Sequence, residues 1–372
     1  MKQHITRHIG IWLLLTALVL AACSSDDEGQ TGTQQETTLQ ILSCQKDFSM
    51  VDHTVTRSLT LPDGFSQIPT PSEGTAIKLF LTRGNSTCLP GVFYYVDGQW
   101  KSRLYETVSN PSCYIYGYMP SINEGSLAPL NSDYKNGAIM TFTDLPSITT
   151  NDPCIITGIK QVDLNTTSAT PEEIATAAGE VKEGRFDYTI KTSPPGNYLY
   201  VLLDHLYASL EFQFQVNEVY ANLRTIKLKK VELKGIQVNN VQTVTLSANN
   251  TGESPIVNLN WSAKEPSDET EYVKIFDSTA GEDLKTTFSE SPVATAQFAP
   301  IYSETQPMTM KCTYDVYVKN GSLIGERHAE NRISQVAGMV RGKKRIITVT
   351  VNPTYLYVLA DPDLDNPAIT VH

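Results

Sequence analysis

The stretch Leu210-Glu211-Phe212-Gln213-Phe214-Gln215-Val216 alternates strictly between apolar and polar side chains. Because successive side chains of a β-strand point to opposite faces of a sheet, this alternation predicts a strand with one buried and one solvated face. In the next segment, residues 224–233, apolar side chains occupy even positions up to Leu228 and odd positions from Val231. One extra residue restores the buried face, so we predict a β-bulge between Lys229 and Lys230.

Short alternating segments of this kind follow one another along most of the chain, with Gly, Pro, Asn and Asp between them. Asp97-Gly98 marks a two-residue hairpin, because both positions favour a positive φ. One helix is predicted, with Thr170 as N-cap, Pro171 at the first helical position and Gly179 at its end. The chain is therefore predicted to be all-β, since many short strands with turns between them are typical of β-sandwiches. The expected strands lie near residues 55–61, 77–81, 92–96, 99–101, 113–119, 138–142, 154–159, 210–216, 224–233, 241–246, 256–261, 272–276, 310–318, 345–351 and 355–359, with a short helix or irregular crossover over 329–340.

The first 22 residues have the pattern of a lipoprotein signal peptide. Lys2 and Arg7 precede an uncharged, mostly apolar run over residues 9–22, which is too short to span a bilayer. The run ends in Leu20-Ala21-Ala22-Cys23, which matches the bacterial lipobox, where small side chains precede a cysteine whose thiol receives diacylglycerol. Cys23 is thus the predicted lipidated N-terminus of the mature protein. A further acyl chain such as palmitate on its amine makes the membrane anchor stable.

The segment after Cys23 predicts surface display on a flexible tether. Ser24-Ser25-Asp26-Asp27-Glu28 resembles the acidic export signal of surface lipoproteins in some Gram-negative anaerobes. Residues 24–38 contain no apolar side chain, so this segment cannot bury surface and is expected to be flexible. We expect four parts: a signal peptide over residues 1–22, a tether over 23–38, an N-terminal β-sandwich over 39–195, and a C-terminal β-sandwich with a terminal strand and tail over 196–372.

The charge and the cysteines exclude several classes of function. Without the first 22 residues, the chain carries 27 basic and 40 acidic residues, a net charge of −13. Such a balance argues against nucleic acid or anionic lipid as the main partner. Besides Cys23, the cysteines are widely spaced and include no CxxC pair, which argues against a zinc site among them. Cys312 shares the apolar parity of the predicted strand 310–318 and is expected in the core, while the disulfide pairing remains open among Cys44, Cys88, Cys113, Cys154 and Cys312.

No common catalytic signature is present in the sequence. GxSxG, HExxH, a Walker-type loop and a dinucleotide fingerprint are all missing, so we predict no enzyme, no catalytic residue, no cofactor and no metal site. His205 stands in an apolar, strand-like context, for which a structural histidine is the favoured interpretation. Asp277-Ser278-Thr279 fits a short O-glycosylation pattern of exported proteins, which makes Ser278 a candidate modification site.

The acidic tail begins like a calcium-binding loop but does not complete it. Asp361, Asp363 and Asp365 have the spacing of the first ligands of an EF-hand. Asn366 and His372 then stand where that loop needs Gly and Glu, so EF-hand chemistry fails.

Together, the lipobox, the acidic export signal and two predicted β-sandwiches resemble the fimbrillin-like family of lipoprotein pilus subunits and adhesins, which form type V pili. Three stretches are also similar to core stretches of that family: residues 114–120 (YIYGYMP), 203–210 (LDHLYASL) and 352–359 (NPTYLYVL). The resemblance covers nearly the whole mature chain and rests on patterned core segments.

The resemblance implies two transthyretin-like Greek-key domains and assembly by strand exchange at the cell outer membrane. In that scheme, the precursor is cut after an Arg near its N-terminus, and the C-terminal strand of a neighbouring subunit fills the groove that the lost strand leaves. Arg57, followed by Ser58, matches the cleavage position, and a plain edge-strand arginine explains it equally well. The donor strand would consist of Thr354, Tyr355, Leu356, Tyr357, Val358 and Leu359.

Two hypotheses of function follow from these features. The first is a surface-exposed lipoprotein of the fimbrium that serves as pilus subunit, anchor or tip adhesin. Its partners would be the outer membrane through the lipid anchor, other pilus subunits, and a host or bacterial surface protein or glycan. The second is a glycan-binding lipoprotein of a polysaccharide-uptake system, which would use exposed aromatic rings such as those of Trp100 and Trp261 as sugar platforms.

Overall fold

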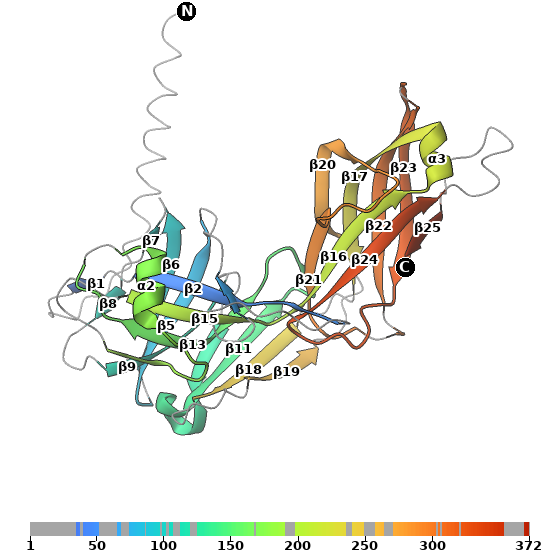
Figure 1. The fold of residues 1–372 in the computed structure, drawn as a ribbon. Coiled ribbons are helices and arrows are strands. Elements are labelled where there is room, and N and C mark those ends of the chain that lie inside the picture. The colour runs from blue at the N-terminus through green and yellow to red at the C-terminus, as the bar shows by residue number, and fades with distance from the viewer. Residues whose placement is uncertain are drawn as a thin grey trace, which may run out of the picture.

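The computed structural model consists mainly of β-strands, arranged in two bodies that lie side by side (Figure 1). It describes residues 35–37, 40–51, 65–67, 74–85, 87–96, 99–101, 104–106, 112–119, 125–166, 169–189, 198–235, 240–248, 257–263, 271–302, 304–305, 307–319, 321–352 and 368–371. The all-β sandwich class predicted from the sequence is confirmed. Within the described segments, neither α-helix reaches the length and hydropathy that a membrane span requires.

A nine-stranded sheet forms the first body, with the order β4-β2-β15-β13-β9-β5-β6-β7 and β14 paired to β9. One face of this sheet buries the odd-numbered side chains of β5 and β15, such as Leu79 and Val201. Near one end of the sheet, β2 contacts β7 at the other end, so the sheet curves around this core. The strands are β2 (Gln40–Lys46), β4 (Phe65–Gln67), β5 (Ala76–Arg83), β6 (Thr87–Val96), β7 (Gln99–Lys101), β9 (Ser112–Met119), β13 (Cys154–Val162), β14 (Asp187–Thr189) and β15 (Tyr198–His205).

The opposite face of the nine-stranded sheet is covered by two layers. Helix α2 (Pro171–Ala178) covers Leu42, Tyr200 and their neighbours, while a four-stranded sheet covers Tyr116 and Tyr118. The order of this smaller sheet is β10-β11-β18-β19. Its strands are β10 (Gly125–Pro129), β11 (Gly137–Leu145), β18 (Asn240–Ser247) and β19 (Val257–Ala263), with the 3-10 turns η1 (Leu130–Ser132) and η2 (Tyr134–Asn136) between β10 and β11. A separate pair joins β1 (Gln35–Thr37) to β8 (Leu104–Glu106).

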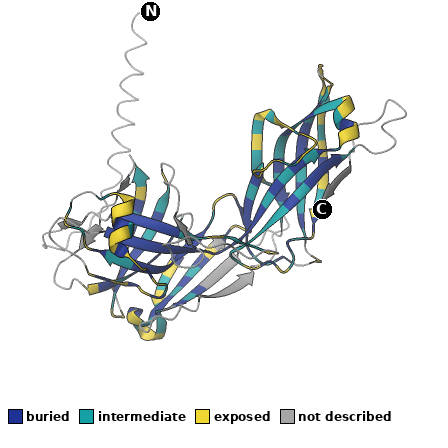
Figure 2. Ribbon diagram, in the orientation of Figure 1, coloured by how far each residue is buried: buried dark blue, intermediate teal, exposed yellow. Residues whose placement is uncertain are grey.

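The second body is a sandwich of a six-stranded and a four-stranded sheet. The first sheet has the order β12-β21-β16-β24-β25 with β3 beside β24, and the second has the order β20-β17-β22-β23. Their facing side chains, among them Phe212, Ile347 and Cys312, form one core (Figure 2). The elements are β3 (Ser49–Met50), β12 (Ile148–Thr149), β16 (Ala208–Val216), α3 (Glu218–Leu223), β17 (Arg224–Lys234), β20 (Val273–Asp283), β21 (Ala294–Phe298), β22 (Met308–Val318), β23 (Leu323–Ile333), β24 (Lys343–Asn352) and β25 (Ala368–Val371).

Several local predictions are confirmed. In β17 the register with β22 shifts between Leu228 and Lys230, so Lys229 is the extra residue of the predicted bulge. Val96 pairs with Gln99, as the Asp97-Gly98 hairpin requires. In α2 the Thr170 hydroxyl accepts the Glu173 N–H at 3.2 Å, and the Glu173 carboxylate accepts the Thr170 N–H at 2.8 Å, which completes a capping box.

One local prediction is wrong in its bounds. The irregular crossover expected over residues 329–340 begins only after Ile333, because residues 329–333 are the second half of strand β23. Alternating charges along that strand obscure its period in the sequence, because it lies at the edge of its sheet and only Ala329 and Ile333 are buried.

Strand pairing crosses the expected domain boundary at residues 195 and 196 in both directions. β15 lies inside the nine-stranded sheet, and β18 pairs with β11, although both follow the boundary. Conversely, β3 and β12 precede it and belong to the six-stranded sheet. The two bodies therefore exchange several segments, and the chain passes between them at Leu206 and Tyr207, both buried, where β15 ends and β16 begins.

Candidate functional site

Most residues singled out in the sequence lie outside the described residues. This holds for the lipidation residue Cys23, for the cleavage pair Arg57 and Ser58, and for the donor segment 354–359. Their roles stay predictions. Trp100 and Trp261 lie in β7 and β19, but their side chains are also outside the description.

Ser278, the candidate glycosylation residue, is half-buried in strand β20. Its hydroxyl accepts the backbone N–H of Gly281 at 3.0 Å, where the strand makes a local turn. A sugar on this oxygen must share it with that hydrogen bond. The modification stays a prediction.

The strand-exchange scheme concerns the first and the last strands of the chain, and the structure describes one strand near each end. β25, the last strand of the chain, pairs antiparallel with β24 over four residue pairs and forms the edge of the six-stranded sheet. β2, the first long strand, pairs in parallel with β15 over six residue pairs and carries only β4 on its other side. Both strands therefore lie at or next to a sheet edge.

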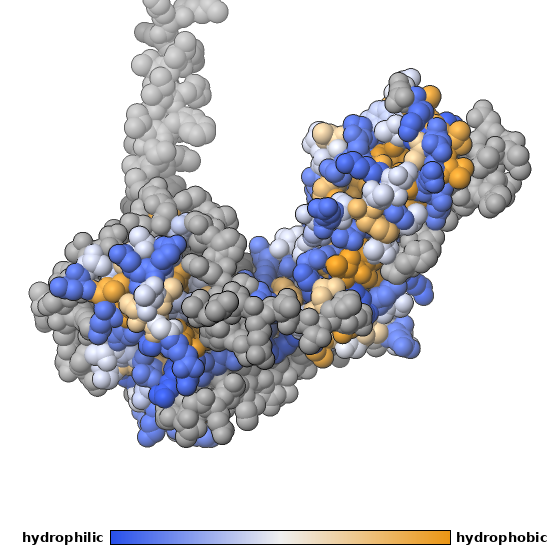
Figure 3. All heavy atoms as spheres, viewed as in Figure 1, coloured by the Kyte–Doolittle hydropathy of each residue, from blue (hydrophilic) through white to orange (hydrophobic). Residues whose placement is uncertain are grey.

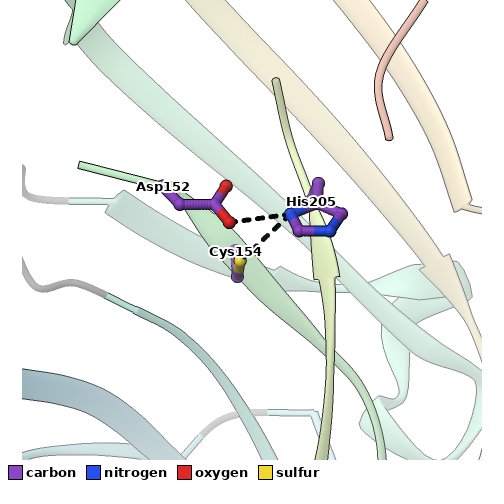
Figure 4. Close-up of side chains that lie close together, drawn as sticks. All are labelled: Asp152, Cys154 and His205. Atoms are coloured by element: carbon purple, nitrogen blue, oxygen red, sulfur yellow. Dashed lines mark hydrogen bonds and ion pairs between the residues drawn. The ribbon is translucent and has the colours of Figure 1, made fainter. Parts of the chain in front are cut away.

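A cluster of chemically competent side chains lies where three strands of the nine-stranded sheet end (Figure 4). We call Asp152, Cys154 and His205 the crossover cluster. Cys154 is the first residue of β13, His205 is the last residue of β15 and pairs with it, and Asp152 lies in the turn before β13. The Asp152 Oδ2 atom lies 2.9 Å, and the Cys154 Sγ atom 3.8 Å, from Nδ1 of His205. The three side chains thus converge on one point.

Gln45, near the end of β2, contacts the crossover cluster from a third strand. Its amide Nε2 lies 3.0 Å from the Cys154 sulfur and 3.2 Å from His205 Nδ1, and it also donates to Asp152 Oδ2. One amide group therefore contacts all three members of the crossover cluster.

The remaining contacts fix the imidazole ring of His205. Its Nε2 contacts the carbonyl oxygen of Lys46, which can only accept, so Nε2 carries a proton. The ring of Phe48 stacks on it with centroids 3.5 Å apart and planes 19° apart. In a cysteine–histidine–aspartate relay, the thiol and the carboxylate contact different ring nitrogens. Here both contact Nδ1, so the three side chains do not have the geometry of such a relay. The structural role of His205 stays a prediction.

Next to the crossover cluster, the carboxylate of Asp204 is buried, with its side chain 3% exposed, and it forms ion pairs with two basic side chains. Arg341 donates to its Oδ2 at 2.8 Å, and Lys46 lies 3.4 Å from the same oxygen. Arg341 also donates to the carbonyl oxygen of His205 at 3.1 Å. Because Arg341 precedes β24 in the second body, these contacts connect the two bodies directly.

Burial governs the thiols of the described cysteines. Burial raises the pKa of Cys154 well above its ordinary value, and the nearby carboxylates of Asp152 and Asp204 raise it further. Burial alone raises the pKa of Cys312 to about 12. Burial also raises the pKa of Cys44, whose sulfur lies 2.9 Å from the Tyr200 hydroxyl. These thiols are buried, as is that of Cys113, which confirms the core position expected for Cys312.

Sequence reasoning noticed His205 but missed the cluster around it. Asp152 and Cys154 are two residues apart. His205 follows Cys154 by 51 residues, and Gln45 precedes Cys154 by 109 residues. No local sequence spacing predicts such a site, because its residues come together only through the antiparallel pairing of β13 with β15. The one available signal was the polar pair Asp204-His205 at the end of an otherwise apolar run, Tyr198–Leu203.

Exposed apolar side chains gather at the far end of the second body, around α3 and the turn between β22 and β23 (Figure 3). Val318, at the end of β22, pairs with Arg224 directly after α3, so helix and turn are neighbours. The exposed residues are Val219, Leu223, Val318, Leu323 and Ile324, of which Val219 is 59% exposed.

Comparison with known proteins gives matches among solved structures alone. No protein-family description matches the chain, and no curated protein matches its sequence. A candidate cell adhesion protein from Bacteroides fragilis aligns with a TM-score of 0.41 and 12% identity, over 91% of this chain and 97% of that protein. The chain is similar to Bacteroides fimbrial and adhesion proteins.

Two further structures have related descriptions. A fimbrial protein from Bacteroides vulgatus aligns with a TM-score of 0.33 and 11% identity, over 81% of this chain and 92% of that one. A candidate cell adhesion protein from Bacteroides uniformis aligns with a TM-score of 0.36 and 12% identity, over 90% and 97%.

Proposed function

We propose that the protein is a non-enzymatic lipoprotein, anchored in the outer membrane through Cys23 and displayed at the cell surface. There it serves as a fimbrial subunit, anchor or tip adhesin and joins its neighbours by β-strand exchange. Its partners are the membrane, other pilus subunits and a surface protein or glycan of a host or bacterial cell. The lipobox and the tether of the sequence support the anchor, and the two-body all-β fold supports the subunit role.

The observation that carries strand exchange is the place of β2. This strand precedes Arg57 in the chain, lies between β15 and the short strand β4, and buries Ile41, Leu42 and Cys44. A cut after Arg57 would separate β2 from the rest of the protein. The backbone groups of β15 would then lose their parallel partner, and an incoming strand could replace it.

β25 supports the donor role of the C-terminus. It is the last described segment of the chain, pairs with β24 over four residue pairs and also contacts β23. An edge strand of this length is easily detached, because few hydrogen bonds hold it. The same tail that closes its own sheet edge is therefore available to a neighbouring subunit.

The test uses the protein in the outer membrane of its native host. Membrane extracts are run on a gel without heating, and the N-terminus is determined by mass spectrometry. We expect an acylated Cys23 in the precursor and detergent-resistant multimers whose subunits begin at Ser58. Arg57→Ala should abolish the cut and the multimers, whereas Arg185→Ala, at an exposed arginine in the first body, should leave both unchanged.

The same experiment also distinguishes a stalk subunit from an anchor or a tip adhesin. A single band that retains acylated Cys23 would contradict a stalk subunit and support an anchor or an uncut tip adhesin. Loss of membrane association in Cys23→Ser is expected in all three roles. If Cys23→Ser stays membrane-bound, the lipid anchor is wrong.

One observation favours the second candidate function, glycan binding. Tyr94 on β6 is 49% exposed and pairs with Lys101 on β7, beside Trp100. Exposed aromatic rings on a sheet surface can stack on sugar rings. A glycan array with the wild-type protein and Tyr94→Ala tests this function. It would be contradicted by equal signals from both proteins.

A further inference from the structure

We propose that the crossover cluster binds a zinc ion. Asp152, Cys154 and His205 offer a carboxylate oxygen, a sulfur and an imidazole nitrogen, all within 4.8 Å of one another. Zinc binds this combination of ligands, and three protein ligands with one open position are a common zinc arrangement. Magnesium and calcium prefer oxygen ligands alone, so the thiol selects against them.

The distances fit a tetrahedral ion. With zinc bonds of about 2.0 Å to nitrogen and oxygen and about 2.3 Å to sulfur, the ligand atoms of a tetrahedron lie roughly 3.3 Å (N to O) and 3.6 Å (N to S) apart. In the cluster, Nδ1 lies 2.9 Å from Asp152 Oδ2 and 3.8 Å from Cys154 Sγ. Shifts of less than half an ångström bring both of these edges, which start at Nδ1, to the ideal values.

The imidazole of His205 already has the orientation that a metal ligand needs. Because Nε2 donates to the Lys46 carbonyl oxygen, a metal would bind Nδ1, in place of the hydrogen that Nδ1 directs to the Asp152 carboxylate at 2.9 Å. Metal-bound histidines characteristically donate their other N–H to a carbonyl or carboxylate in this way. The stacked ring of Phe48 holds the plane of the imidazole.

The cluster is also short of hydrogen-bond donors. The Gln45 amide contacts Sγ, Nδ1 and Asp152 Oδ2 at once, but it has only two hydrogens to give, and the Cys154 thiol adds one more toward Asp152. Asp152 Oδ1 is buried and has no hydrogen-bond partner. Arg341 and Lys46 direct their charges to Asp204 instead. A dication between the three ligand atoms would satisfy these acceptors better than one amide does.

Binding is coupled to proton release. Zinc forms a Zn–S bond as the S–H bond of Cys154 breaks and a Zn–N bond in place of the hydrogen between Nδ1 and the Asp152 carboxylate, and these protons pass to solvent. Gln45 is half-buried and the Asp152 side chain is 22% exposed, so the ion enters past these two residues. The fourth ligand is then water or, after rotation of the amide, Oε1 of Gln45.

The place of the site suggests its role. β13 and β15 carry two ligands, β2 carries the supporting Gln45 and Lys46, and the chain continues from His205 directly into the second body. A bound ion would cross-link these strands at the passage between the two bodies. Zinc is therefore expected to stiffen the junction and to raise the thermal midpoint of the protein.

The test is a titration of metal-free, reduced, detergent-solubilised lipoprotein with Co²⁺ and then Zn²⁺. We expect a thiolate-to-cobalt charge-transfer band with one ion per chain, tetrahedral d–d bands, and loss of both spectra when zinc is added. Cys154→Ser should abolish the charge-transfer band. Cys113→Ser and Cys312→Ser, which remove cysteines outside the cluster, should retain it.

A milder variant keeps the proposal testable if Cys154→Ser does not fold. Asp152→Asn keeps the size of a partly exposed side chain and should weaken cobalt binding at least 10-fold while the charge-transfer band persists at saturation. The proposal is overturned if folded wild-type protein shows no charge-transfer band, if the band survives Cys154→Ser, or if Asp152→Asn binds cobalt as tightly as wild type.

Discussion

The contact between Arg341 and Asp204 predicts a specific energetic coupling between the two bodies. We consider replacing Arg341 by Met, which keeps much of the aliphatic length and removes the guanidinium. Asp204 is 3% exposed, and Arg341 supplies a hydrogen bond of 2.8 Å to its carboxylate. The same arginine donates to the carbonyl oxygen of His205. The substitution therefore leaves a buried charge with one partner fewer.

The size of the effect follows from that loss. Removing one partner of a buried ion pair costs about 3–5 kcal/mol when the remaining charge is left uncompensated. Lys46 still lies 3.4 Å from the Asp204 oxygen, but its side chain is 35% exposed and screened by water. We therefore expect Arg341→Met to lower the free energy of unfolding by about 2 kcal/mol, or the thermal midpoint by about 4–8 °C.

A double-mutant cycle measured by urea unfolding isolates the pair. Asp204→Asn removes the buried charge, so the double variant should lose about 2 kcal/mol less than the sum of the two single losses. Arg332→Met, at an exposed position of β23, serves as control and should change stability by no more than about 0.5 kcal/mol. A coupling energy below about 0.5 kcal/mol would refute the reasoning, because the buried carboxylate would then not depend on Arg341.

Three further predictions concern the C-terminal tail, helix α2 and the thiol of Cys312. Deleting residues 353–372 removes β25 and the proposed donor segment, so folded protein should no longer form multimers on an unheated gel; persisting multimers would contradict the donor role. Thr170→Ala breaks the capping box and should cost about 1 kcal/mol in urea unfolding, with no change expected for Thr189→Ala beyond about 0.5 kcal/mol. Burial raises the pKa of Cys312 from 9.0 to about 12, so the stability from the protonated thiol is complete below pH 9 and is lost as the pH rises toward 12. By about pH 10.5 the loss is roughly 2 kcal/mol, which Cys312→Ala should remove from the pH profile of the urea midpoint; an unchanged profile would contradict it.

Local pattern predicted local structure well wherever one face of an element meets water. The parity slip between Leu228 and Val231 located the bulge of β17 to the residue, because a half-buried strand has to keep its apolar side chains on one face. The hairpin between β6 and β7 and the cap of α2 were likewise predicted from turn and cap residues. In each case the deciding interactions lie within a few residues of one another.

Long-range pairing could not be predicted in the same way. All eight residues of β15 are buried, so its sequence carries no alternation that would mark it as the centre of a sheet. The sequences of β18 and β19 alternate clearly, but nothing in them indicates that β18 pairs with β11. The paired residues of β11 and β18 are more than 90 positions apart; Thr141, for example, pairs with Thr243. The crossover cluster depends on those pairings, which is why the sequence showed its members separately.

The strand β2 connects the proposed assembly to the proposed zinc site. It contributes Gln45 and the Lys46 carbonyl to the crossover cluster, and Phe48 follows directly after it. All three precede Arg57, whereas the ligands Asp152, Cys154 and His205 follow it. A cut after Arg57 with loss of β2 would leave the ligands in place but remove the partner that orients His205, and losing such a partner typically weakens metal binding 10–100-fold. Zinc affinity should therefore be higher in the uncut precursor than in a subunit whose first strand has left, and it should return only if the incoming strand offers a carbonyl oxygen at the position of Lys46.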